Sequence, residues 1–438
     1  MKKSGFIIIL FFCFIICALG QNSSIDIISY DIKANCELNK RFIDINANLK
    51  IEKTVNENSF KLLLGSWTKI KSIMSGDKVI EYFRKSPDDD TLLISIPMQF
   101  NNDKIFNLSI DYALPLDSFD SKNKEIVFLQ RNSLWYPMQY DDIASMKLDV
   151  ISPNDYTVFA IGDLINKKSI KNNIEYNFEN KQNNRYSLFI IKSDTFITTL
   201  TRKLDSVNFN FYFVSNDTIT TNKIINEVCK SFSFYNKYIG NYKYRQFNIV
   251  EIPDNRIFYA QSLSTIILIG SPFLNAYKLD YGNWPAHEVA HQWWGNGVYT
   301  NNKAKGGLFL EESVNEYFKA LYIENSLGND SLKSQLKSYH NLYLEIDKTK
   351  ELSILEITNF STMENGYVIY QKGALIVNNL RNQMGSKSYE NFIKEIYKNY
   401  YGKVLTFENF ITVLSNYDTK GNLVNTLIKW LSETGYKE

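Results

Sequence analysis

The stretch HEVAHQWWGN, residues 287–296, decides how this 438-residue chain is interpreted. It holds two of the three histidines in the chain, His287 and His291, four residues apart. Four residues are about one helical turn, so on a helix both imidazoles lie on one face. Pro285 favours a helix that begins just before them, because the first turn does not need the missing N–H. Two imidazoles on one helix face can supply two corners of a tetrahedral zinc site.

A catalytic zinc needs a third protein ligand beside one open position. The candidate segment is GGLFLEESVNEYFKALYIENSLGN, residues 306–329, which the spacing of its apolar residues predicts to be a helix. Its available carboxylates are those of Glu311, Glu312 and Glu316, and the pattern alone leaves open which one binds metal. Glu288 projects to the side of the histidine face. In HExxH sites this glutamate does not bind the metal but holds the bound water and removes its proton.

The composition of the chain excludes several other classes of protein. The formal net charge of +2 gives no basis for binding nucleic acid or an anionic membrane surface. A hydrophobic content of 44% with 15% aromatic residues is typical of a globular protein rather than a disordered one. The length predicts two or three domains, each able to bury its own core.

The first twenty residues, MKKSGFIIILFFCFIICALG, have the pattern of a secretory signal peptide. We expect residues 1–20 to be removed before Gln21, and the mature protein to be periplasmic or extracellular. A lipoprotein needs a small residue before its acylated cysteine, but Cys17 follows Ile16. An uncleaved anchor helix is the other alternative, although about 14 apolar residues are short for a membrane span. No later stretch is long and apolar enough to cross a bilayer.

After this removal two cysteines remain, Cys36 and Cys229. Two cysteines so far apart in the chain are not a disulfide framework. One bridge between domains and two free thiols both stay open, and in either case the stability of the protein must come from its cores.

Two sequence patterns divide the chain. Up to residue 205 it consists of short period-two runs, such as FIDINANLKIEK at 42–53, separated by turn-forming residues. This pattern predicts an antiparallel β domain over residues 21–205. Helical spacing then begins, first in IINEVCKSFSFYNKYIG at 224–240, and dominates the rest of the chain. The predicted fold class is therefore α+β, with a mostly helical zinc domain over residues 206–438.

The motifs resemble those of the gluzincin zinc metallopeptidases of the aminopeptidase N and leukotriene hydrolase family, peptidase family M1. There, HExxHxW(F/W)GN is followed by a helix that opens in a pattern such as WLNEGFAEY. Matching FLEESVNEY to that pattern puts Glu312 on the ligand glutamate, but the distance from His291 is two residues longer than usual, so Glu311 stays open. The resemblance implies one zinc ion per chain, held by His287, His291 and Glu312, with Glu288 as general base.

A second block, YVIYQKGALIVNNLRNQMG at 367–385, resembles the family's TVYEKGA segment. The tyrosine of that segment stabilises the oxyanion of the tetrahedral intermediate, a role that falls on Tyr370. A phenol suits it because it donates a hydrogen bond without carrying charge. WYP at 135–137 resembles part of the family's N-terminal domain, so we expect a saddle-like β domain followed by a thermolysin-like catalytic domain. We also expect a short form that lacks the family's C-terminal helical domain.

One segment departs from the family pattern. Aminopeptidases of the family carry a GxMEN segment before the zinc helix, and its glutamate binds the free α-ammonium of the substrate. The corresponding stretch here, IFYAQSLSTIILI, puts Gln261 at that position. Loss of a charge-assisted hydrogen bond is worth on the order of 1–2 kcal/mol. Taken together, the motifs and the N-terminal pattern predict an exported zinc metallopeptidase that acts on peptide or protein substrates as an aminopeptidase. The alternatives are an endopeptidase or dipeptide-releasing peptidase, and a non-catalytic peptide-binding relative.

Overall fold

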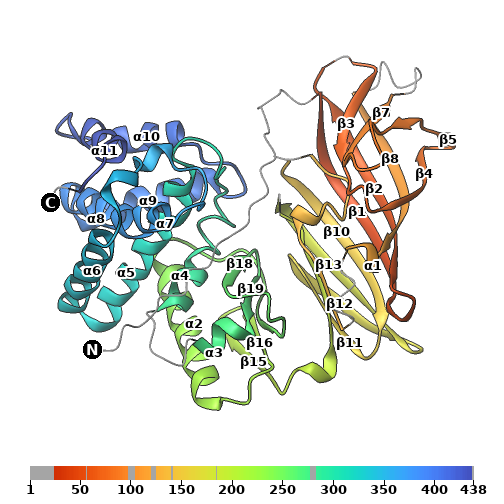
Figure 1. Ribbon diagram of the computed structural model, residues 1–438, viewed down its shortest axis with the longest axis horizontal. Helices are drawn as coiled ribbons and strands as arrows, with labels where there is room; N and C mark the ends of the chain where they lie inside the picture. The colour runs from red at the N-terminus through yellow and green to blue at the C-terminus, as the bar shows by residue number, and fades with distance from the viewer. Residues whose placement is uncertain are drawn as a thin grey trace.

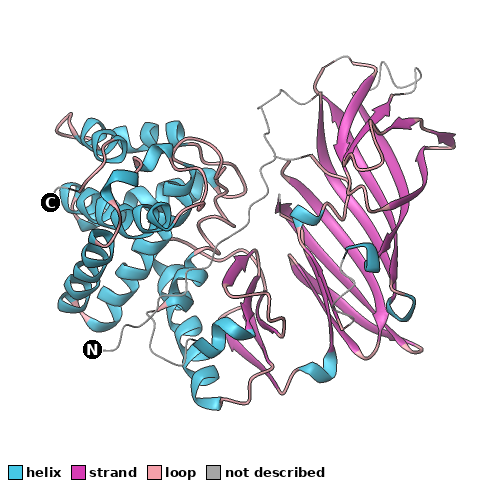
Figure 2. Cartoon of the chain, viewed as in Figure 1, coloured by secondary structure: helices cyan, strands magenta, loops and turns pink. Residues whose placement is uncertain are grey.

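The chain folds into a strand-rich first lobe and a second lobe in which helices pack around a smaller sheet (Figure 1, Figure 2). The computed structural model describes residues 24–55, 57–96, 104–119, 125–139, 142–183, 185–276 and 283–436. The predicted signal peptide, residues 1–20, lies outside these ranges. Within them, no helix has the length and apolar character needed to span a membrane.

An eight-stranded sheet with the order β12-β13-β10-β1-β2-β8-β4-β5 forms the first lobe. These strands are β1 (Ile25–Glu37), β2 (Phe42–Lys53), β4 (Lys69–Ser75), β5 (Lys78–Val79), β8 (Ile105–Pro115), β10 (Ala144–Pro153), β12 (Asp163–Ile170) and β13 (Asn173–Asn183). Neighbouring strands are antiparallel except β1 and β10, which run parallel. Every second residue of β2 is buried along most of its length, so its period-two pattern turns one face to the core.

Two three-stranded sheets complete this lobe, in the orders β11-β14-β9 and β3-β7-β6. Their strands are β3 (Ser59–Leu63), β6 (Tyr82–Phe83), β7 (Thr91–Ser95), β9 (Ile126–Leu129), β11 (Tyr156–Ala160) and β14 (Leu188–Lys192). A short helix, α1 (Leu116–Phe119), follows β8. The α+β class predicted from the sequence, with its strand-rich domain first, is confirmed.

The sheet of the second lobe has the order β15-β16-β17-β19-β18. Its strands are β15 (Thr198–Leu204), β16 (Val207–Phe213), β17 (Gln246–Ile252), β18 (Ala260–Leu263) and β19 (Ile266–Gly270). Because β15 pairs with β16, strand pairing divides the chain between Lys192 and Thr198, whereas the sequence pattern placed the domain boundary at 205/206. Alternation in β15 resembles that of the earlier strands, and alternation alone does not show which strand a segment pairs with.

The small sheet joins the cores of the two lobes. All seven residues of β17 are buried, as expected for a strand covered on both faces. On one face Phe247 and Ile249 pack into the core of the second lobe, which includes α2 (Thr218–Tyr238). On the other face Val250 and Ile252 pack into the core of the first lobe. This shared packing fixes the position of the edge strand β18 relative to both lobes.

The rest of the second lobe is mainly helical (Figure 1). Its helices are α3 (Ser271–Ala276), α4 (Trp284–Ala290), α5 (Val314–Leu327), α6 (Asn329–Leu344), α7 (Met363–Tyr367), α8 (Gly373–Met384), α9 (Ser386–Tyr400), α10 (Phe407–Ser415) and α11 (Leu423–Ser432). Two π-helical turns, η6 (Phe309–Ser313) and η9 (Val368–Lys372), lead into α5 and α8. Cys36 is buried in the first lobe and Cys229 is half-buried on α2. Both are free thiols, so within the described residues no disulfide joins the lobes.

Candidate active site

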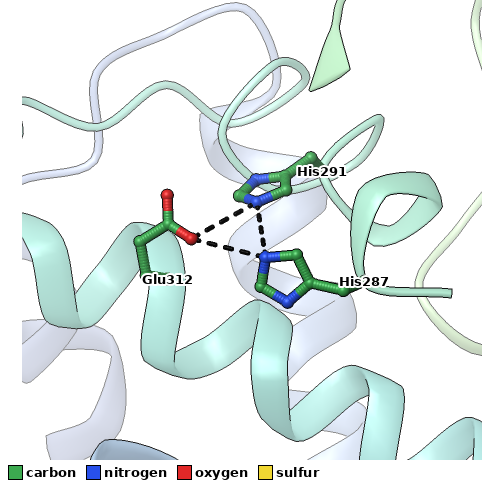
Figure 3. A group of neighbouring side chains, drawn as sticks. All are labelled: His287, His291 and Glu312. Carbon is green, nitrogen blue, oxygen red and sulfur yellow. Dashed lines mark hydrogen bonds and ion pairs between the residues drawn. The ribbon is translucent and has the colours of Figure 1, made fainter. Parts of the chain in front are cut away.

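Three side chains from two elements converge in the second lobe (Figure 3). His287 lies on α4 and His291 at its end, and their Nε2 atoms are 3.1 Å apart. Glu312, on the turn η6, places Oε2 3.4 Å from His287 Nε2 and 3.5 Å from His291 Nε2. Ligand atoms of a tetrahedral zinc with bonds of about 2.0–2.1 Å lie about 3.3–3.4 Å from one another. The spacing of the three donors therefore fits a zinc ion.

The electrostatics of the three groups also favour a cation. Burial alone lowers the pKa of His287, but hydrogen bonds to Glu312 and Glu316 raise it to about 10. Burial raises the pKa of Glu312, yet the positive charge of His291 and hydrogen bonds from both imidazoles hold that pKa well below its usual range. The carboxylates thus stabilise a positive charge between the imidazoles. A dication bound by two neutral imidazoles and one carboxylate supplies that charge.

The structure separates the two adjacent glutamates that the sequence left as alternatives. Glu312 faces the histidines. Glu311 instead accepts a hydrogen bond from Arg185 Nη1 at 3.1 Å and one from Thr300 Oγ1 at 2.5 Å. The metal group therefore contains Glu312 and not Glu311.

The tryptophan of the motif at position 294 ties the two metal-binding elements together. Trp294 Nε1 donates a hydrogen bond to the carbonyl oxygen of Leu310 in η6, at 2.5 Å. The carbonyl of Trp294 in turn lies 3.2 Å from Nδ1 of His291 and accepts from the amide of Asn315 at 2.7 Å. This network holds Nε2 of His291 toward the site, as partners of a metal-binding histidine generally do.

Glu316 orients the other histidine, His287, in a similar way. Its Oε2 is 2.9 Å from Nδ1 of His287, and its other oxygen contacts the ammonium of Lys319. The sequence analysis treated Glu316 only as a possible ligand and missed this role. The four-residue spacing from Glu312 was a usable signal, because it puts both carboxylates on one side of the helix. Nothing in the sequence signalled the role of Asn315.

Glu288 follows His287 on α4 and is electrostatically coupled to the metal group. Burial raises its pKa, the charges of His287 and His291 lower it, and Glu312 raises it. The backbone of Ser262 is close enough to lower the pKa of this carboxyl. Since Ser262 belongs to the edge strand β18, Glu288 lies next to the sheet of the second lobe.

Tyr370 also lies at the site, on the second π-helical turn η9. Its ring centroid is 5.8 Å from that of His287, and the ring stacks on Phe360 at 5.4 Å. Burial raises the pKa of the phenol well above its usual value, and the carboxylates of Glu312 and Glu288 raise it further. The hydroxyl therefore keeps its proton and can donate a hydrogen bond.

Gln261 lies on β18, one residue before the strand's contact with Glu288. Its Oε1 accepts a hydrogen bond of 2.7 Å from Nε2 of Gln130, which belongs to the first lobe. The sequence analysis missed Gln130, since no local pattern relates two residues 131 positions apart. The position predicted to contact the substrate thus holds a pair of neutral amides contributed by both lobes.

The fold and the metal group define a gluzincin-type zinc site, in which an HExxH helix is followed by a helix that supplies a glutamate. Residues 224–431 match the family model described as the peptidase family M1 domain. The chain therefore carries a domain of peptidase family M1 and is a zinc metallopeptidase. No curated protein matches it in sequence.

Several solved structures share the fold. The M1 zinc metallopeptidase from Deinococcus radiodurans superposes with a TM-score of 0.74 at 13% identity, over 96% of this chain and 97% of that one. A variant of that protein bound to a Tyr-Ser-Ala substrate gives a TM-score of 0.73 at 14% identity, over the same shares of the chains. Yeast LTA4 hydrolase in complex with bestatin gives 0.70 at 16% identity, over 95% of this chain and 69% of that one. At these identities the likeness concerns the fold.

Proposed function

We propose that the chain is an exported aminopeptidase in which Glu288 is the general base and Tyr370 the oxyanion donor. The observation that carries the catalytic part is the arrangement of both side chains against the metal group. Glu288 is electrostatically coupled to both histidines, and the Tyr370 ring lies 5.8 Å from the His287 ring with its phenol electrostatically coupled to Glu312. A base and a neutral donor therefore flank the same three ligands.

The chain's own residues divide the reaction between them. A zinc ion held by His287, His291 and Glu312 would supply Lewis-acid chemistry, polarising the scissile carbonyl and lowering the pKa of bound water. Glu288 accepts the proton of the attacking water and passes it to the leaving amine. Tyr370 donates a hydrogen bond to the oxygen that gains negative charge. Glu316 and Asn315 keep the two imidazoles in the orientation that the site requires.

The variant Glu288→Gln tests the base. It keeps the size of the side chain and removes its proton-accepting charge, so we expect zinc content to stay at one per chain. Hydrolysis should fall by at least about 10²–10⁴-fold, the usual contribution of a general base. Glu408→Gln, at an exposed position on α10, is the matched control and should behave as wild type. Wild-type activity in Glu288→Gln would refute the mechanism, and inactivity of the unmodified protein toward every peptide would favour a non-catalytic binding protein.

The amide pair supports a second candidate function, an endopeptidase or dipeptide-releasing peptidase. Gln130 and Gln261 offer no negative charge to a free α-ammonium. Matched free and N-acetylated peptides separate the candidates, because an aminopeptidase releases single residues from the free peptide alone. Equal cleavage of both peptides would instead establish endopeptidase activity.

A charge restored at position 261 should sharpen the preference for a free N-terminus. For Gln261→Glu we expect the free-to-acetylated ratio of kcat/KM to rise by about 5- to 30-fold, equivalent to about 1–2 kcal/mol. Gln261→Leu is the control that removes the amide without adding charge, and it should not raise the ratio. An unchanged ratio in Gln261→Glu would show that this position does not meet the N-terminus of the substrate.

Export is supported by the pattern of residues 1–20. Expression of the full chain with a C-terminal tag, followed by fractionation and N-terminal sequencing, should give extracytoplasmic protein that begins at Gln21. Membrane-bound protein that still begins at Met1 would identify an uncleaved anchor, and an acylated Cys17 would identify a lipoprotein.

A further inference from the structure

The ligand turn η6 carries two adjacent carboxylates with opposite surroundings. Glu312 faces the histidines, whereas Glu311 points away from them and is only 5% exposed. A buried carboxylate is strongly unfavourable unless cations or hydrogen-bond donors compensate it. The partners of Glu311 therefore decide whether this turn can keep its conformation.

The negative charge of Glu311 is compensated by hydrogen-bond donors from two residues. Arg185 donates from Nη1 to Oε1 at 3.1 Å and from Nη2 to Oε2 at 3.4 Å. Thr300 Oγ1 donates to Oε2 at 2.5 Å. Arg185 Nη2 also reaches the carbonyl oxygen of Thr300 at 3.5 Å, so one guanidinium joins the ligand turn to the loop that follows the zinc helix. Such two-pronged geometry favours arginine over lysine.

The cation comes from the other lobe. Arg185 lies between β13 and β14 of the first lobe, 126 positions before Glu311 in the chain. The neighbouring contact runs the same way, because Tyr299 donates its hydroxyl proton to the carbonyl of Gln182 at 2.9 Å. The docking of the first lobe thus supplies the positive charge that Glu311 needs.

Glu311 is also packed closely behind a metal ligand. Gly295 separates them: a Cβ atom added there would lie 3.0 Å from Nδ1 of His291 and 3.5 Å from Cγ of Glu311. The carbonyl of Glu311 accepts a hydrogen bond from Asn315, whose amide nitrogen is 2.9 Å from the same imidazole nitrogen. A movement of Glu311 therefore disturbs Glu312, its neighbour in the chain. It also disturbs the surroundings of Nδ1 of His291.

We propose that Arg185 is a positioning residue of the metal centre, and that its ion pair with Glu311 locks the ligand turn so that Glu312 meets the histidines. Metal affinity in this protein then depends on the docking of the two lobes. The inference rests on the zinc site and is independent of whether the substrate is a free or a blocked peptide.

A double-mutant cycle tests the lock, with zinc alone as the probe, titrated into the metal-free full chain against a competing chelator. Arg185→Met leaves a buried carboxylate without its cation, and Glu311→Gln leaves a guanidinium without its anion near the metal. We expect each to weaken zinc binding by about 10- to 100-fold, the usual effect of losing a group that supports a metal ligand. The double variant has neither uncompensated charge, so its affinity should return to within about threefold of wild type.

An ion pair that lies wholly within the second lobe is the control. Arg381 and Glu324 pair at 2.8 Å with comparable burial and join α8 to α5. Arg381→Met, Glu324→Gln and their double variant should leave zinc affinity unchanged even where they lower the melting temperature. Circular dichroism of the same samples gives the folded fraction, which a purely structural role would change in both cycles.

The outcomes are decisive in each direction. Unchanged or tighter zinc binding by Arg185→Met overturns the proposal, and so does a double variant at least as weak as the weaker single variant. If Arg185→Met does not yield folded protein, the double variant decides: folding with near-wild-type affinity supports the lock, and failure to fold or weak binding overturns it. Because no peptide is present, an absence of peptidase activity does not affect the result.

Discussion

At the scale of single residues, Tyr370 is the group whose role can be isolated most cleanly. Its ring is held by stacking on Phe360, and its hydroxyl lies near Glu312. Tyr370→Phe keeps the ring and removes only the hydrogen-bond donor. Loss of one oxyanion donor typically costs about 10²–10³ in kcat. We expect that loss, with KM and zinc content close to those of wild type.

The neighbouring Tyr367→Phe is the matched control for this prediction. Tyr367 lies one turn earlier, at the end of α7, where the charge that acts on its phenol is that of Glu345. Its kcat should match that of wild type. Steady-state kinetics on one peptide decide the matter, and a wild-type kcat for Tyr370→Phe would remove the tyrosine from the mechanism.

Residue chemistry explains which site residues the sequence could predict. His287 and His291 are scarce residues at a regular spacing, so their pairing was predictable. The family pattern also put Glu312 on the ligand position, and the structure confirms it. Only the longer distance from His291 left Glu311 open, because the length of a loop does not show which of two adjacent carboxylates faces the imidazoles. Gln130 and Arg185 reach the site only through the docking of the lobes.

At the scale of elements, the two π-helical turns meet directly. Ser313, the last residue of η6, donates its hydroxyl proton to the carbonyl of Ile369 in η9 at 2.6 Å. Gly373, the first residue of α8, allows this approach, because an added Cβ would collide with Ser313 Oγ and lie 2.5 Å from its Cβ. The same contact sets the position of Glu312 relative to Tyr370, since one lies on each turn.

Gly373→Ala should therefore separate the two turns. We expect a loss of about 1–3 kcal/mol in the free energy of unfolding, as for other overpacked sites, together with reduced kcat. Gly366→Ala is the control, because Gly366 lies in α7 and, among the described residues, its added Cβ would meet no atom within 4 Å beyond its own helix backbone and chain neighbours. Alanine is the better helix former there by about 1 kcal/mol, so this variant should be as stable as wild type or more so. Denaturant unfolding checks both, and equal stability of the two variants would contradict the contact.

The elements themselves were predicted unevenly. The zinc helix and the acidic helix carry strong local signals, namely Pro285 in the first turn of one and glycines around the other. Both helices form, although the acidic helix opens with the π-helical turn η6. β15 has only an alternating pattern, which the strands of both lobes share. Its assignment depends on pairing with β16, and pairing between sheets is a property of the folded chain. This explains why the predicted boundary fell after β15 rather than before it.

At the scale of the whole molecule, the site is built at the junction of the two lobes. The second lobe provides the metal ligands, while the first provides Gln130 and Arg185. The sheet that carries β18 is buried against the cores of both lobes. Binding of a metal that requires this arrangement must, by linkage, stabilise it against unfolding.

Removal of the metal should therefore change both activity and stability. At a free zinc concentration one hundred times the Kd, binding contributes about 2.7 kcal/mol of stability. For a protein of this size that corresponds to a fall in melting temperature of roughly 3 °C when a chelator removes the metal. We expect hydrolysis to stop in the chelated protein, and zinc to restore both properties.

A pair of isomers separates chelation from binding of an aromatic ring. The chelator is 1,10-phenanthroline, and the control is its non-chelating isomer 1,7-phenanthroline. The control should change neither the hydrolysis rate nor the melting temperature. The variant His291→Ala should show the low melting temperature without any chelator and no response to added zinc, since it lacks one of the three ligands. If the chelator abolishes activity without lowering the melting temperature, the metal is not coupled to the folded arrangement of the lobes. If activity survives complete zinc removal, the metal-dependent mechanism itself is refuted.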